Sequence, residues 1–134
     1  MQGKHPVRVL IVDDDQPIRL SLKLVLGSDP DIEVVGEAVN GRQAVELTAE
    51  TQPDVVLMDC KMPVMDGLEA TQLIKSRQPE VKVIMLTAAF GNRDKAHAAG
   101  ADAFLLKDAG SIHKLRAAVL GSNNHAKTLK QQSR

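Results

Sequence analysis

The chain has 134 residues, no formal net charge, and 1% aromatic residues against 43% hydrophobic ones. This length suits one domain with an aliphatic core, and the balanced charge argues against a general attraction to nucleic acid or to membrane surfaces. The single cysteine, Cys60, excludes an internal disulfide and a zinc cluster. No apolar run has the length of a membrane span or the form of a secretion signal, so we expect a cytoplasmic protein.

Apolar runs and helical repeats alternate through the first part of the chain. Residues 7–12 are almost continuously apolar and rich in β-branched side chains, as in a strand buried on both faces. The next apolar positions recur at helical spacing, which predicts a helix that Asp15 caps and Gly27 ends. A second strand is expected over 32–38, and the turn signal Asn40-Gly41 separates it from a second helix.

The same alternation continues to residue 120. A third strand is expected over 55–58, and a loop containing Pro63 and Gly67 precedes a third helix. The remaining expected elements are a strand over 81–86, a short helix over 94–99, a strand over 103–106 and a last helix over 112–120. Five strands that alternate with five helices predict an α/β fold with a right-handed, doubly wound parallel sheet.

The composition changes after Gly121. Residues 122–134 are polar, contain no acidic side chain and carry Lys127, Lys130 and Arg134. We expect this segment to be a tail or the stub of a linker, and the folded domain to span residues 6–121.

Four of the predicted strands end in side chains that can take part in phosphoryl chemistry. Asp13 and Asp14 follow the first strand, Asp59 the third, Thr87 the fourth and Lys107 the fifth. Because the carboxyl ends of parallel strands share one edge of the sheet, these groups are expected to converge there. Carboxylates with open positions suit Mg²⁺, and a carboxylate such as that of Asp59 can attack phosphorus to form an aspartyl phosphate.

Each of these residues also has a purely structural interpretation. Asp15 is best explained as a helix cap, Thr87 as a cap before residues 88–90, and Lys107 as a solvated loop lysine. The functional interpretation rests on the combination of positions, in which Asp59 repeats the placement of Asp13 and Asp14.

With these residues in place, the chain resembles the receiver domain of bacterial two-component response regulators. The resemblance extends from about Pro6 to Leu120. The motifs that carry the resemblance are Val-Asp-Asp-Asp (12–15), Met-Asp-Cys-Lys-Met-Pro-Val-Met-Asp-Gly (58–67), Leu-Thr-Ala (86–88) and Leu-Leu-Lys-Asp-Ala (105–109). The resemblance implies a flavodoxin-like sheet with strand order 2-1-3-4-5, an order that flavodoxin shares with a chemotaxis receiver.

The resemblance also implies roles for individual residues. Asp59 stands at the phosphorylated aspartate, Asp13 and Asp14 at the Mg²⁺-binding acidic pair, and Lys61 where a backbone carbonyl also binds the metal. Thr87 matches the hydroxyl residue that turns toward the phosphoryl group. Lys107 matches the lysine that pairs with it, and Phe104 matches an aromatic switch, although an aromatic residue on a strand is as often a packing residue.

The implied function is a phosphorylation switch in a two-component system. A sensor histidine kinase would donate the phosphoryl group, and the phosphorylated form could dimerise through the region of the last helix. Asp108-Ala109 after Lys107 resembles the NarL/LuxR-type subgroup, whose longer members regulate transcription through a C-terminal DNA-binding domain. Residues 122–134 are too short for such a domain, so DNA contact would need an output domain outside this chain.

Three other functions share parts of this pattern. A stand-alone receiver that serves as a protein-interaction adaptor remains an alternative. An aspartate-nucleophile, Mg²⁺-dependent phosphatase usually has a second acid two residues after the nucleophile, where this chain has Lys61. A flavin- or nucleotide-binding module would want a glycine-rich or hydroxyl-rich loop where this chain has residues 13–15. The unusual Lys61 leads to the hypothesis that its side chain alters the lifetime of an aspartyl phosphate.

Overall fold

The computed structural model describes residues 5–88, 91, 93–108 and 114–121. Its strands are β1 (Val7–Val12), β2 (Ile32–Ala38), β3 (Val55–Asp59), β4 (Lys82–Thr87) and β5 (Ala103–Leu106). Its labelled helices are α1 (Gln16–Gly27), α2 (Gly41–Thr51), α3 (Gly67–Arg77) and α4 (Arg93–Ala98), and residues 114–121 are helical as well. All strand pairs are parallel and the order is β2-β1-β3-β4-β5, which confirms the predicted fold.

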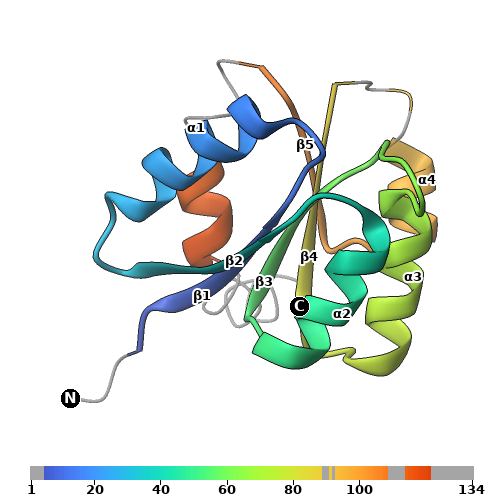
Figure 1. The fold of residues 1–134 in the computed structure, drawn as a ribbon, viewed down its shortest axis with the longest axis horizontal. Coiled ribbons are helices and arrows are strands. Elements are labelled where there is room, and N and C mark those ends of the chain that lie inside the picture. Colours follow the sequence, from blue (N-terminus) through green and yellow to red (C-terminus); the bar gives the residue numbers. More distant parts are fainter. Residues whose placement is uncertain (1–4, 89–90, 92, 109–113, 122–134) are drawn as a thin grey trace, which may run out of the picture.

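The helices lie on both faces of this sheet (Figure 1). Helix α1 and the helical segment 114–121 cover one face, where Leu22, Leu26 and Leu115 pack against alternate residues of the central strands. Helices α2, α3 and α4 cover the other face, where Val45 and Ile74 belong to a second buried cluster. Burial on both faces explains why β1 and β3 consist almost entirely of apolar residues.

Three of the helices begin at a short polar side chain that accepts a hydrogen bond from the first turn. Asp15 caps α1, Asn40 caps α2 and Asp66 caps α3. The cap at Asp15 confirms the prediction. The Asn40-Gly41 pair was expected to form a turn, but Gly41 is the first residue of α2 and the Asn40 side chain accepts from the backbone N–H of Gln43 at 2.9 Å.

Two strands differ from the predicted boundaries by one residue. Strand β4 starts at Lys82 instead of Val81, because the Val81 N–H closes a turn onto the carbonyl of Gln78. Strand β3 extends to Asp59, which pairs with Leu86 of β4. The predicted helix over 112–120 is seen as helix from 114 onward, while residues 112–113 and the predicted tail over 122–134 lie outside the described residues.

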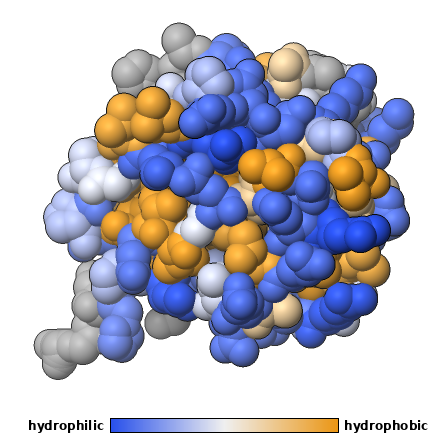
Figure 2. Space-filling model, viewed as in Figure 1, coloured by the Kyte–Doolittle hydropathy of each residue, from blue (hydrophilic) through white to orange (hydrophobic). Residues whose placement is uncertain are grey.

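Figure 2 shows a surface on which hydrophilic residues predominate and apolar groups form small separate patches. Among the residues that the structure describes, the exposed large apolar side chains are Leu20, Leu24, Val39 and Val64. Among the helices of the described residues, none combines the length and apolarity that crossing a bilayer requires.

Candidate functional site at the carboxyl edge of the sheet

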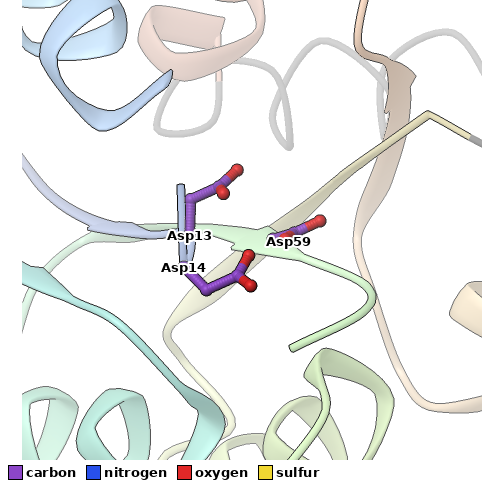
Figure 3. A group of neighbouring side chains, drawn as sticks. All are labelled: Asp13, Asp14 and Asp59. Atoms are coloured by element: carbon purple, nitrogen blue, oxygen red, sulfur yellow. The ribbon is translucent and has the colours of Figure 1, made fainter. Parts of the chain in front are cut away.

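The three predicted carboxylates meet at the edge where β1 and β3 end (Figure 3). Asp13 and Asp14 directly follow β1, and Asp59 is the last residue of β3. One carboxylate oxygen from each residue lies within 4.8 Å of the others. Asp13 and Asp59 are buried, whereas Asp14 is exposed, so the group is open to solvent on one side. The predicted convergence of these residues is therefore observed.

The turn after β1 positions Asp13 and Asp14 through several hydrogen bonds. The Asp13 N–H donates to the carbonyl of Ala38 on β2 at 3.1 Å, which continues the strand pairing into the site. One carboxylate oxygen of Asp13 accepts from the Asp15 N–H at 2.9 Å. Asp15 in turn accepts from the Ile18 N–H at 3.3 Å, so the same three-residue turn presents two acids and starts α1.

Lys107 joins the two buried carboxylates. Its Nζ lies 2.6 Å from Oδ2 of Asp13 and 2.9 Å from Oδ1 of Asp59. The backbone N–H of Lys107 donates to the carbonyl of Thr87 at 2.8 Å, which fixes the start of the lysine side chain beside the end of β4. The alternative of a solvated loop lysine is thereby wrong, because the side chain is 17% exposed and its ammonium is held by two ion pairs.

Burial and neighbouring charges both affect how Asp59 ionises. Burial raises the pKa of Asp59 to about 6, and the negative charges of Asp13 and Asp14 act in the same direction, while the hydrogen bond from Lys107 opposes the rise. Burial also disfavours the charged ammonium of Lys107, but its bonds to Asp13 and Asp59 outweigh burial and raise the pKa of Lys107. The group of three carboxylates is thus balanced by one ammonium, which bonds to two of them, and a bound cation would stabilise this arrangement.

The chemistry of these three donors fits a small, hard divalent cation. Carboxylate oxygens are the ligands that Mg²⁺ prefers, and Mg²⁺ retains several water molecules, so it needs few protein ligands and an open side. The exposed Asp14 borders that open side. The residues present therefore fit the cofactor that the sequence predicted.

The loop after Asp59 is held against the sheet by close backbone contacts. The Gly67 N–H donates to the carbonyl of Cys60 at 2.8 Å, and a Cβ on Gly67 would lie 1.9 Å from the carbonyl oxygen of Asp59. The Gly41 N–H donates to the carbonyl of Met65 at 2.8 Å, and a Cβ there would also clash. Sequence reasoning treated both glycines as turn signals and missed this role, because nothing in the local pattern shows which segment approaches them.

The two predicted switch residues lie on neighbouring strands. Thr87 is buried at the end of β4, and Phe104 is a partly buried residue of β5 opposite Met85. Phe104 packs against the core on the α4 side of the sheet and lines a cavity of about 350 Å³ together with residues of α4 such as His97. A conformational role for Thr87 and Phe104 stays a prediction, and residues 89–90, which Thr87 would cap, lie outside the described residues.

Two residues next to Asp59 differ in their setting. Cys60 is 2% exposed and belongs to the apolar cluster, and burial raises the pKa of its thiol, as expected for a small packing residue. Lys61 is exposed two residues after Asp59, so its side chain is free to reach solvent near the site. Metal binding by the Lys61 carbonyl stays a prediction.

Comparison with known proteins agrees with this geometry. Residues 9–120 match the model of the response regulator receiver domain. Response regulator protein VraR of Staphylococcus saprophyticus is 40% identical over 104 residues, which cover 76% of this chain and 50% of VraR. The chain thus spans about half the length of the curated relatives it matches.

Solved structures show the same architecture. The signal receiver domain of the response regulator NarL from Mycobacterium tuberculosis has a TM-score of 0.81 and 34% identity, covering 87% of this chain and 94% of that one. A LuxR-family DNA-binding response regulator from Staphylococcus aureus has a TM-score of 0.80 and 30% identity, covering 87% of this chain and 98% of that one. The chain therefore belongs to the receiver domain family of two-component response regulators.

Proposed function

We propose that this receiver takes a phosphoryl group from a sensor histidine kinase onto Asp59. The observation that carries the proposal is the convergence of Asp13, Asp14 and Asp59 within 4.8 Å, with Lys107 bonded to the two buried members. In the proposed site Asp13, Asp14 and Asp59, together with the Lys61 carbonyl, would hold Mg²⁺. When bound, the metal would neutralise charge on the carboxylates and on the transferring phosphoryl group.

The transfer itself is a displacement at phosphorus. A carboxylate oxygen of Asp59 forms the new O–P bond while the P–N bond of the kinase phosphohistidine breaks, and the imidazole nitrogen leaves with the electron pair. Lys107 is placed to stabilise the added negative charge, because its ammonium already lies 2.9 Å from Asp59. The burial of Asp59 supports this role, since electrostatic contacts are stronger where water is excluded.

The conformational response is proposed to run through Thr87 and Phe104. A phosphoryl group on Asp59 gives the Thr87 hydroxyl a strong acceptor at the edge of the sheet. Movement of Thr87 would free space toward Phe104 and favour a different conformation of the β4, α4 and β5 surface. Such a switch works only if the phosphoryl group binds one pre-existing conformation better than the other.

The output lies beyond the domain. The similarity to VraR and to a LuxR-family DNA-binding regulator supports a transcriptional output in a longer protein of the cytoplasm, through a DNA-binding domain outside this sequence. Dimerisation on phosphorylation and loss of the phosphoryl group by autodephosphorylation belong to the same proposal. The adaptor alternative differs only in its output, and shares the chemistry at Asp59.

The test is to incubate the chain with acetyl phosphate and Mg²⁺ and to record its intact mass. We expect a Mg²⁺-dependent gain of one phosphoryl group that Asp59→Ala abolishes and that Asp31→Asn, at an exposed aspartate away from the site, retains. A failure of both acetyl phosphate and the phosphoryl mimic beryllofluoride to act on Asp59 would overturn the proposal. In the same assay Lys61→Ala reports on phosphoryl lifetime, and an unchanged loss rate would refute the role proposed for Lys61.

A further inference from the structure

We propose that Arg19 is a positioning residue for the metal site, through its hydrogen bond to the backbone of Asp13. This inference rests on the proposed Mg²⁺ binding of the receiver and assigns a residue on α1 to that site. Arg19 follows the acidic pair by about one helical turn and was not among the residues that the sequence motifs singled out. The hydrogen bonds of its side chain in the structure are what point to this role.

The guanidinium of Arg19 connects three parts of the fold. Its Nη1 donates to the carbonyl oxygen of Asp13 at 2.7 Å, and its Nε donates to Oε1 of Glu37 on β2 at 3.0 Å. The side chain is only 13% exposed. The Arg19 N–H also donates to the carbonyl of Asp15 at 3.1 Å, at the start of α1, so the residue holds the turn by backbone and side chain.

This contact matters most for Asp14. Among the described residues, no group forms a hydrogen bond or ion pair with the Asp14 carboxylate, so the backbone of the turn sets its direction. The peptide group between Asp13 and Asp14 contains the carbonyl that Arg19 binds. Rotation of this peptide group would turn the Asp14 side chain relative to Asp13 and Asp59. The bond from Arg19 therefore restrains the exposed ligand through its own backbone.

Glu37 keeps Arg19 in place through an ion pair. The carboxylate of Glu37 pairs with Lys23 at 2.8 Å and with Arg19, and these contacts, the Lys23 hydrogen bond foremost, lower the pKa of Glu37. Glu37 thus stays ionised at neutral pH, and its single negative charge is shared by Arg19 and Lys23. Arginine suits this position because its planar group reaches two acceptors from one rigid fork, whereas a lysine offers a single nitrogen.

Lys23 provides a matched control. Lys23 and Arg19 lie on the same helix and bind the same glutamate, but Lys23 is 43% exposed and only Arg19 reaches the carbonyl of Asp13. Substitution of either residue removes an ion pair to Glu37. Substitution of Arg19 alone removes the restraint on the acidic turn.

The experiment measures the Mg²⁺ affinity of the folded chain by titration calorimetry, alongside its melting temperature in EDTA. Outer partners of metal ligands typically contribute about ten-fold or more to metal affinity, and we expect a Kd increase of about that size for Arg19→Ala. Lys23→Ala is expected to leave the Kd unchanged. Arg19→Lys keeps the positive charge and the aliphatic part of the side chain, and is also expected to bind Mg²⁺ more weakly than the wild type. This variant replaces Arg19→Ala in the test if Arg19→Ala does not fold.

The outcomes separate the inference from the function on which it rests. If the wild type takes up no Mg²⁺, the proposed metal site fails and the role of Arg19 fails with it. If the wild type binds and the Arg19 variants bind equally well, only the inference is overturned, even where their melting temperature falls. Equal weakening by Lys23→Ala would also overturn it, because the loss would then follow from the ion pair with Glu37.

Discussion

Asp59 combines burial with a negative charge, and this combination opposes the stability of the folded chain. Its carboxyl group belongs to a residue that is 6% exposed and shares its surroundings with Asp13 and Asp14, so its pKa rises from 3.8 to about 6. Such a rise corresponds to about 3 kcal/mol of disfavoured ionisation. Lys107 offsets only part of this cost, so the ionised Asp59 carboxylate leaves a net destabilisation that a bound cation would reduce.

We expect Asp59→Asn to be more stable than the wild type at pH 7 in EDTA, by about 1–3 kcal/mol. The folded wild type binds a proton more tightly than the unfolded chain, so it loses stability as the pH rises from about 4 to about 6, and the asparagine variant has no such group to ionise. Urea unfolding followed by circular dichroism at several pH values measures the difference.

The advantage of Asp59→Asn should shrink as the pH is lowered from 7 toward 4, and saturating Mg²⁺ should reduce it at pH 7. Asp31→Asn, at an exposed aspartate, serves as the control that removes a carboxylate elsewhere. A variant that is no more stable than the wild type at pH 7 would contradict the raised pKa of Asp59.

At the scale of elements, the site depends on how helix starts meet strand ends. Gly67 begins α3 directly against the backbone of Asp59, and Gly41 begins α2 against the backbone of Met65. Each close approach leaves no room for a side chain. The loop between β3 and α3 is therefore held at both ends, and Val64 within it adopts a φ of 71°, which is unfavourable for a β-branched residue.

Gly67→Ala should destabilise the domain by about 1–3 kcal/mol, because the added methyl group must displace the backbone of Asp59 at the end of β3. Gly27→Ala is the matched control, since a Cβ on this helical glycine meets nothing within 4 Å. The control should be neutral or more stable by up to about 1 kcal/mol. The urea unfolding midpoints of the two variants measure their changes in stability. Equal changes for Gly67→Ala and Gly27→Ala would show that the packing at Gly67 is less tight than the structure indicates.

At the scale of the whole molecule, an ion pair joins segments that are 87 residues apart. Arg116, on the helical segment 114–121, donates from Nε to Oδ2 of Asp29 at 2.7 Å, and Asp29 lies in the turn between α1 and β2. The Asp31 N–H donates to the same carboxylate group at 2.8 Å. The last helix is thereby fastened to the layer that α1 forms (Figure 1).

The bond from the Asp31 N–H, followed by the bond from Arg116, lowers the pKa of Asp29. The ionised carboxylate of Asp29 therefore stabilises the fold fully above the pKa that Asp29 has in the unfolded chain. This stabilisation is lost as the pH falls through the lower pKa that Asp29 has in the folded chain. We expect Asp29→Asn to be less stable than the wild type at pH 7 and to approach it in acid, as urea unfolding at several pH values would show. Arg116→Gln should show part of this loss, because it leaves the bond from Asp31 intact. A difference between Asp29→Asn and the wild type that does not depend on pH would refute this account.

Much of the fold was predictable because it rests on local patterns. The apolar run at 7–12 and the helical spacing after Asp15 depend on near neighbours in the chain, and both predicted elements are observed at those places. It was equally predictable that the side chains at the strand ends converge, because parallel strands bring their carboxyl ends together. These side chains are Asp13, Asp14, Asp59 and Lys107. These features follow from periodicity and from one rule of topology.

Other features required the tertiary structure, because they depend on contacts between distant segments. No local pattern indicates that Lys107 bonds to Asp13 as well as Asp59, or that Arg19 reaches the carbonyl of Asp13. The same holds for Gly67, whose neighbour is the backbone of another element. The sequence by itself determined the order of the elements and the chemical groups at the sheet edge. Only the packing of the helices on the sheet decided which of those groups touch, and hence how burial and charge set the pKa of Asp59.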